Sequence, residues 1–193
     1  MHQALIQYIN ERTTTPLSES EIRTIKNIFT PRRIRKRQYF LQEGDVCRYT
    51  GFIVKGAMRQ YSVDDKGTEH IVRLYIENWW AGDRESFVKQ TPSNYNIDAW
   101  EDTDLLTITR SSMVEFNKIP ALNELARNLD EMHSIAYQRR INSTISHSAE
   151  QQYAELAKTY PEFLQRFPQH IIASYLGITK ETLSRIRTQA LRK

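Results

Sequence analysis

Two short helices joined by a tight turn are predicted at the C-terminal end of the sequence, over residues 169–187. Gly177 can supply the positive φ that a sharp turn requires, and the small side chain of Ala173 lets the second helix pack closely. The hydroxyl of Thr179 is placed to cap that second helix. The apolar residues fall where the two helices would bury against each other: Ile172, Leu176, Ile178, Leu183 and Ile186. This pattern is typical of a helix-turn-helix, whose second helix lies in the major groove of DNA.

The outward-facing side chains of the second helix are of the types that read DNA. We expect Arg185 to make a bidentate contact to guanine, Glu181 to accept a bond from a cytosine amine, and Lys180 to contact a base or a phosphate. The other residues on this face are expected to contact the DNA backbone and to fix the register: Gln169, His170, Thr182, Ser184 and Arg187, with Thr179 at the start of the helix. An ordinary helical hairpin is the alternative for this segment.

The positive charge of the chain is concentrated near this motif. Residues 1–150 hold 20 Lys+Arg and 20 Asp+Glu, whereas residues 151–193 hold 7 and 3 and so carry the whole net charge of +4. A domain that meets phosphates is expected to show such an excess, although a solvated basic tail gives the same count. The basic run 32–37 is predicted to open a strand with most of its charges in solvent.

The preceding part of the chain is predicted to form a β domain followed by a long helix. Residues 34–108 contain short β-branched and aromatic runs separated by turn signals, which indicates a small sandwich or barrel. A capping box at Ser18 and Glu21 begins a helix ahead of it. Further on, apolar residues spaced three and four apart form a heptad seam that predicts a dimer interface: Leu122, Leu125, Leu129, Met132 and Ala136. Packing on the β domain of the same chain is the alternative for this helix, and the two can coexist.

A β domain, a long helix and a C-terminal helix-turn-helix in this order resemble the Crp/Fnr family of bacterial transcription regulators. The resemblance is carried by Glu43-Gly44-Asp45, Ile53-Val54-Lys55-Gly56, Asp65-Lys66-Gly67, Gly82-Asp83 and Ala99-Trp100-Glu101-Asp102-Thr103. It implies an α+β fold with an N-terminal β jelly-roll effector domain, a dimerisation helix and a winged helix-turn-helix. We expect these parts at residues 1–117, 118–146 and 147–193. Only six residues follow Arg187, so the wing is expected to be truncated.

The resemblance also implies an effector site. Gly82-Asp83 would take the place of the Gly-Glu pair that bonds the ribose in cyclic-nucleotide-binding members. Ser93-Asn94 would take the place of the Arg-Ser or Arg-Thr pair that binds the cyclic phosphate. A buried phosphate needs a charged donor, and Arg84 is displaced in sequence, so we expect an effector other than a cyclic nucleotide. The candidate pocket residues are Trp80, Gly82, Asp83, Arg84, Ser93, Asn94 and Tyr95. The rings of Trp79, Phe87 and Trp100 either join them around a less charged ligand or simply fill the cavity.

Several classes of function are disfavoured by what the sequence lacks. Cys47 is the only cysteine, so an internal disulfide and a cysteine-held iron–sulfur or zinc site are excluded. A cupin enzyme needs two or three histidines and a carboxylate around a metal, but His70 is the only histidine between residues 34 and 108. We therefore expect no metal, no cofactor and no enzymatic activity. The sequence shows neither a signal peptide nor an apolar run long enough to span a membrane, which favours a cytoplasmic location.

Together these patterns predict a homodimeric, sequence-specific transcription regulator that binds double-stranded DNA. A small-molecule effector and RNA polymerase are further candidate partners, and no membrane is expected. Two alternatives stay open: a regulator that responds to a cyclic nucleotide, and a ligand-binding adaptor that does not bind DNA.

Overall fold

The computed structural model describes residues 1–190, in which a β sandwich is flanked by helices. Helices α1 (His2–Arg12) and α2 (Glu19–Ile28) come first, and the capping box predicted at Ser18 and Glu21 begins α2. The strands follow in chain order: β1 (Thr30–Ile34), β2 (Tyr39–Leu41), β3 (Tyr49–Lys55), β4 (Met58–Val63), β5 (Glu69–Tyr75), β6 (Trp80–Ala81), β7 (Asn96–Ala99) and β8 (Thr103–Thr109). The remaining helices are α3 (Arg84–Lys89), α4 (Met113–Phe116), α5 (Pro120–Ser146), α6 (Ala149–Thr159), α7 (Pro161–Arg166), α8 (Gln169–Leu176) and α9 (Lys180–Ala190).

The strands form two antiparallel sheets that enclose a common core. Within residues 1–190, one sheet has the strand order β1-β8-β3-β6 and the other the order β2-β7-β4-β5. Apolar side chains from both sheets are buried between them: Ile34, Leu41, Ile53, Met58, Tyr75, Ile97 and Leu105. Because side chains alternate across a strand, the other face of each strand is left for helices or solvent. The predicted α+β fold with a β jelly-roll is confirmed.

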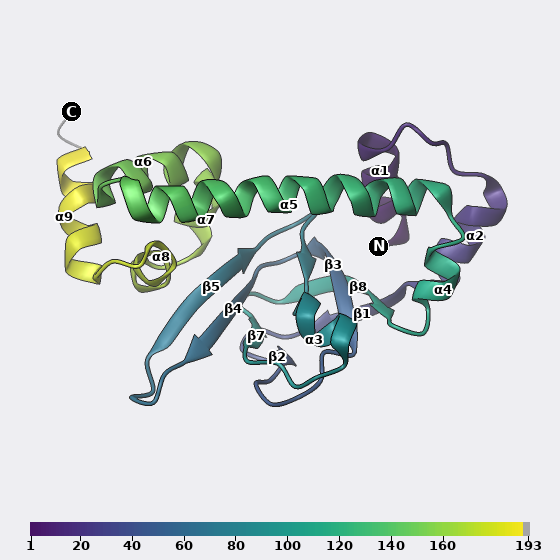
Figure 1. The fold of residues 1–193 in the computed structure, drawn as a ribbon, viewed down its shortest axis with the longest axis horizontal. Helices are drawn as coiled ribbons and strands as arrows, with labels where there is room; N and C mark the ends of the chain where they lie inside the picture. Colours follow the sequence, from purple (N-terminus) through teal and green to yellow (C-terminus); the bar gives the residue numbers. More distant parts are fainter. Residues whose placement is uncertain (191–193) are drawn as a thin grey trace.

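Helix α5 runs along one side of the molecule (Figure 1). Helices α1 and α2 lie near its start, α6–α9 lie near its end, and the sandwich lies beneath its middle. Pro120 stands in the first turn, where its missing N–H costs no intrahelical hydrogen bond. The helix predicted over residues 118–146 is confirmed with a start two residues later. Among the helices of residues 1–190, none has both the length and the apolar character needed to cross a membrane.

The first part of the predicted dimer seam is buried inside the chain's own core. Leu122 and Leu125 are 0% and 1% exposed and belong to one hydrophobic cluster with Tyr8 and Ile9 of α1. Leu129 packs partly against the same cluster. The prediction that Leu122 and Leu125 form the dimer interface is therefore wrong. The heptad spacing identified an apolar face correctly, but α1 folds back along α5 and covers the start of that face.

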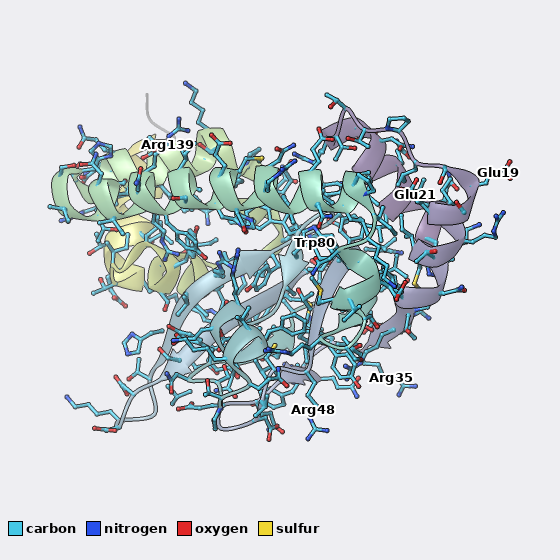
Figure 2. All side chains as sticks on the ribbon, turned by 45° about the vertical axis from the view of Figure 1, so that its right-hand side comes forward. Glu19, Glu21, Arg35, Arg48, Trp80 and Arg139 are labelled. Atoms are coloured by element: carbon cyan, nitrogen blue, oxygen red, sulfur yellow. The ribbon has the colours of Figure 1, made fainter. Side chains whose placement is uncertain are left out.

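The basic run 32–37 lies largely in solvent, as predicted, but it ends β1 and continues into a turn at residues 35–37 rather than opening a strand. Arg33 forms an ion pair with Asp104 on the neighbouring strand, at 2.7 Å. Arg35 points away from the sandwich, as does Arg48 nearby (Figure 2). Arg32 is half-buried, and its guanidinium lies 5.5 Å from the centre of the Phe40 ring. The run is therefore a solvated edge of the β domain, which we define as residues 30–109.

The C-terminal domain, residues 147–190, shares a hydrophobic cluster with the β domain. Side chains of β4 and β5 join side chains of α6–α9 in this cluster: Tyr61, Ile71, Leu74, Leu156, Phe163, Phe167, Ile171, Ile172 and Leu183. The predicted boundary at residue 147 stays a prediction, because the packing continues across it. Helix α9 extends to Ala190, and the remaining residues 191–193, on which part of the predicted truncated wing falls, lie outside the described chain.

Candidate nucleic-acid interface and effector site

The turn between α8 and α9 has the geometry that the sequence predicts. Gly177 ends α8 with φ of 69°, in the left-handed region. The N–H of Ile178 donates to the carbonyl of Ala173 at 3.0 Å, which satisfies one of the free carbonyls at the end of α8. Thr179 Oγ1 accepts a hydrogen bond from the N–H of Thr182 at 3.2 Å and so caps α9. The predicted cap and turn are confirmed.

Helix α9 separates an apolar face from a polar one. Leu183 and Ile186 are buried against α8 and its neighbours. This burial turns the opposite face to solvent, because residues three and four apart share one side of a helix. An open hollow of about 600 Å³ lies along the polar face, and Gln169 from the start of α8 borders it with residues of α9: Lys180, Glu181, Ser184, Arg185, Thr188 and Gln189. The hollow thus brings together five of the nine predicted DNA-contact residues.

The other four predicted contact residues lie outside the lining of this hollow. Thr179 and Thr182 form the cap described above. Arg187 is half-buried on another side of α9. The ring of His170 lies 6.3 Å from that of Trp100 in the β domain, on a side that the prediction did not foresee. These placements favour a smaller set of DNA-contacting residues than the sequence alone indicates.

Thr188 and Gln189 line the hollow although the sequence analysis did not select them. Each lies four residues after a selected position, Ser184 and Arg185 respectively. The helical period could therefore have identified both. They were missed because the motif was taken to end at Arg187, whereas α9 continues for another turn.

The segment that would bind a cyclic nucleotide is closed by hydrogen bonds within itself. Asp83 caps α3 by accepting from the N–H of Glu85 at 3.1 Å. Its second oxygen accepts from the hydroxyl of Ser93 at 2.7 Å. Ser86 Oγ accepts from the N–H of Cys47 at 2.8 Å and donates to the carbonyl of Thr91 at 2.5 Å. Asp83 and Ser93 are therefore adjacent in space, as predicted, but their carboxylate and hydroxyl groups are hydrogen-bonded to each other.

Arg84 is directed away from this segment. Its guanidinium forms a two-pronged ion pair with Asp130 of α5, with one N–O distance of 2.8 Å. Hydrogen bonding to Asp130 raises the pKa of Arg84 and lowers the pKa of Asp130. A cyclic phosphate placed beside Ser93 would thus meet the Asp83 carboxylate rather than a cation. Like charges repel, so these residues do not fit a cyclic nucleotide.

The tryptophans do not line one common pocket, which favours the alternative in which their rings fill the core. Trp80 packs among Phe29 and Phe52 beneath α5 (Figure 2). The adjacent ring of Trp79 points to the other side, as consecutive residues of an extended chain do, and contacts the C-terminal domain. Trp100 also contacts the C-terminal domain. Trp80 is therefore not an effector-pocket residue.

The remaining pocket candidates do not form an enclosed site. The N–H of Tyr95 donates to the hydroxyl of Ser93 at 3.1 Å, and Tyr95 itself is half-buried. Asn94 is exposed. Gly82 has φ of 155° and approaches Thr50 closely, so it shapes the backbone ahead of α3. Phe87 belongs to the core between the sheets.

Comparison with known proteins identifies the class of fold. Residues 31–118 match the family model described as the cyclic nucleotide-binding domain. No curated protein sequence matches the chain. FixK2 from Bradyrhizobium japonicum is 18% identical, with 84% of both chains covered and a TM-score of 0.66. A mutant of CooA from Carboxydothermus hydrogenoformans is 18% identical over 93% of this chain and 86% of that one, with a TM-score of 0.69.

A third similar structure is the regulator CLP of Xanthomonas campestris, which is described as c-di-GMP responsive. It is 12% identical over 91% of this chain and 92% of that chain, with a TM-score of 0.68. At these identities the structural likeness establishes the fold. Residues 31–118 therefore match the cyclic nucleotide-binding domain, and the overall fold is that of solved regulators of the Crp/Fnr type.

Proposed function

We propose that the chain is a sequence-specific, DNA-binding transcription regulator of the Crp/Fnr type and not an enzyme. The observation that carries this proposal is the exposed polar face of α9, where Lys180 and Arg185 border an open hollow while the opposite face is buried. Arg185 is suited to pair with guanine, and Glu181 to accept from cytosine. The net charge of +4 in residues 151–193 supplies the attraction to phosphates.

Dimerisation is proposed through the second half of α5. Apolar side chains there are exposed, in contrast to the leucines at its start: Met132, Ile135, Tyr137, Ile141 and Ile145. Arg139 marks the side of α5 that faces away from the sandwich (Figure 2). Met132 and Ile135 lie on one side of the helix and Ile141 and Ile145 on the opposite side, so a two-fold dimer would bury one of these sides and present two recognition helices about 34 Å apart. Of the predicted seam, Met132 and Ala136 lie in this exposed part.

An effector other than a cyclic nucleotide is part of the proposal. The self-bonded pair of Asp83 and Ser93, and the engagement of Arg84 by Asp130, support it. RNA polymerase is proposed as a further partner. Whether the chain activates or represses transcription depends on the position of its operator.

Selection of duplexes from a random-sequence pool tests the proposed function. The purified chain is expected to enrich a two-fold symmetric site and to bind it about 10³- to 10⁷-fold more tightly than unselected DNA. The logarithm of the affinity is expected to fall linearly with the logarithm of the salt concentration. If no duplex is retained at low salt, DNA binding is rejected and the ligand-binding adaptor becomes the favoured function.

A further inference from the structure

The C-terminal domain covers the open edge of a β sheet. Strand β5 is the last strand in the order β2-β7-β4-β5, so its outer N–H and C=O groups have no strand partner. Helix α8 lies along this edge, and the hydroxyl of Ser174 bonds to it twice. It accepts from the N–H of Ile71 at 3.0 Å and donates to the carbonyl of Glu69 at 3.1 Å. Because these hydrogen bonds are directional, the N–H of Ile71 reports on whether α8 keeps this orientation on β5.

Arg166, the last residue of α7, is held by two carboxylates of the β domain. Its guanidinium donates to both oxygens of Glu101, at 3.0 and 2.6 Å, and to both oxygens of Glu77, at 2.5 and 3.2 Å. The backbone carbonyl of Arg166 also accepts from the indole N–H of Trp100, at 3.1 Å. Side chain and main chain of one residue are thus both fixed to the β domain. We call Arg166, Glu77 and Glu101 the Arg166 triad.

The Arg166 triad is better suited to define the orientation of the C-terminal domain on the β domain than to supply the free energy that holds the two domains together. Its side chains are only 21% to 36% exposed, so their desolvation offsets much of the electrostatic attraction. Burial opposes ionisation of Glu77, but hydrogen bonds from Arg166 and from the N–H of Gly56 overcome it and lower the pKa of Glu77. The planar guanidinium can meet two carboxylates in only a narrow range of arrangements. The free energy that holds the two domains together comes instead from burial in the shared hydrophobic cluster, and the hydrophobic effect is non-directional.

The position of Arg166 in the chain connects the triad with DNA recognition. It lies three residues before Gln169, the residue at which α8 begins. Helices α8 and α9 pack against each other through buried side chains, so they move together. An anchor at the entrance to α8 therefore controls the orientation of α9 relative to α5.

We propose that Arg166 is a positioning residue, which orients the recognition helix on the β domain and thereby defines the half-site spacing that the dimer accepts. This inference rests on the proposed function, because it concerns DNA binding by a dimer. Two linked recognition helices gain affinity from each other only when their geometry permits simultaneous contact. A dimer with oriented recognition helices discriminates between spacings, and a dimer with loosely held ones does not.

The first experiment measures how firmly the orientation of α8 on β5 is held, without DNA. Amide hydrogen exchange is compared between the unmodified chain, Arg166→Met and the control Lys158→Met, which removes an exposed positive charge of the same domain. In Arg166→Met, exchange at Ile71 is expected to become at least about tenfold faster, while Leu183, whose N–H bonds within α9 to Thr179, keeps its protection. Lys158→Met is expected to leave both unchanged. Unaltered exchange at Ile71 in Arg166→Met overturns the proposal.

A second variant covers the case in which Arg166→Met unfolds the C-terminal domain, seen as lost protection at Leu183. The double variant Glu77→Gln and Glu101→Gln leaves that domain's sequence intact and removes the same ion pairs. It is expected to release Ile71 selectively. Retained protection at Ile71 in the double variant overturns the proposal as well.

The second experiment measures spacing discrimination on the selected duplex. Insertion of one to three base pairs between half-sites is expected to weaken binding of the unmodified chain by about ten- to a hundredfold. For Arg166→Met the loss is expected to shrink to about threefold or less, with affinity for a single half-site unchanged. A variant that keeps full discrimination overturns the proposal. If the unmodified chain binds no duplex, the proposed function fails and the spacing role with it, whereas the exchange at Ile71 still decides whether Arg166 holds the two domains together.

Discussion

At the scale of single residues, carboxylates hold the helical parts of the molecule together. Glu124 on α5 accepts from the backbone N–H of Thr14 at 2.8 Å and of Thr15 at 3.0 Å, and from both hydroxyls. The hydrogen bond from the N–H of Thr14 is the largest of the contributions that lower the pKa of Glu124 to about 2. One side chain thus fixes the loop after α1 to the helix that α1 covers.

Glu124 is expected to make the stability of the chain depend on pH in the acid range. Its folded pKa lies below the ordinary value of 4.5, so its contribution is complete above about pH 4.5 and is lost as the pH falls toward 2. Thermal unfolding of Glu124→Gln should show a deficit that is largest near neutral pH and shrinks below pH 4. Glu131→Gln, an exposed carboxylate on the same helix, is the control. A deficit independent of pH would contradict this role.

Arg185 is the residue on which base recognition is expected to depend most. Arg185→Ala should cost about 1–3 kcal/mol of binding free energy and relax specificity at one base pair of the selected duplex. Arg48→Ala removes the same charge from the distant edge of the β domain, and it should leave binding unchanged. Quantitative gel shifts on single-base variants of the duplex provide the measurement. Unchanged affinity in Arg185→Ala counts against the assignment.

At the scale of elements, the two halves of α5 have different environments. Leu125 is fully buried under α1, whereas Met132 and Ile135 are 50% and 42% exposed. The apolar heptad seam ends at Ala136, and its next positions are Arg139, Ser143 and Ser146. What distinguishes them is that side chains of α1 pack against the first half of α5.

Substitutions in the two halves of α5 should therefore have different effects. Leu125→Ala is expected to lower the free energy of unfolding by about 2–5 kcal/mol with no change in oligomeric state. The double variant Met132→Ser and Ile135→Ser is expected to yield monomers, with each folded chain nearly as stable as before. Chemical denaturation and sedimentation of both variants test the pair. A dimeric double variant would place the interface elsewhere.

Helix α9 shows how far local pattern extends at this scale. The turn at Gly177, the cap at Thr179 and the buried Leu183 depend on interactions within about ten residues, and each was predicted correctly. The extension of α9 to Ala190 lies beyond the predicted motif, which ends at Arg187.

At the scale of the whole molecule, charged groups link the β domain to both other parts. Arg84 joins α3 to Asp130 of α5. Arg140 of α5 donates to the carbonyls of Val72 in β5 and Tyr175 in α8. Any ligand that moves α3 or β5 is therefore expected to act on α5 and on the recognition helix together.

Cyclic AMP is expected not to stabilise the chain. A ligand at a hundred times its Kd adds about 2.7 kcal/mol to the free energy of unfolding, which thermal unfolding detects readily. Because Ser93 is hydrogen-bonded to Asp83 and Arg84 is paired with Asp130, the melting temperature should be the same with and without the nucleotide. A rise that saturates with cyclic AMP concentration would restore the cyclic-nucleotide alternative.

The aromatic residues show why the effector site was harder to predict than the helix-turn-helix. Trp79, Trp80 and Trp100 are close in sequence to the predicted pocket, and they were grouped on that basis. Their positions depend on which packing partner reaches each face: Phe29 and Phe52 for Trp80, and Phe163 and Phe167 for the other two. Those partners lie far away in the chain, so no local pattern indicates them.

The sequence by itself determined a small β sandwich or barrel, the long helix and the two C-terminal helices with their turn, because periodicity, caps and turns are interactions between near neighbours. The jelly-roll was implied by the family resemblance. Only the tertiary structure decided that α1 covers Leu122 and Leu125, that Asp83 bonds to Ser93, and that Arg166 joins Glu77 and Glu101. Each of these depends on groups brought together from distant parts of the chain. A buried or charged side chain can pack or pair with any suitable group that the fold brings next to it, and the sequence pattern does not specify which group that is.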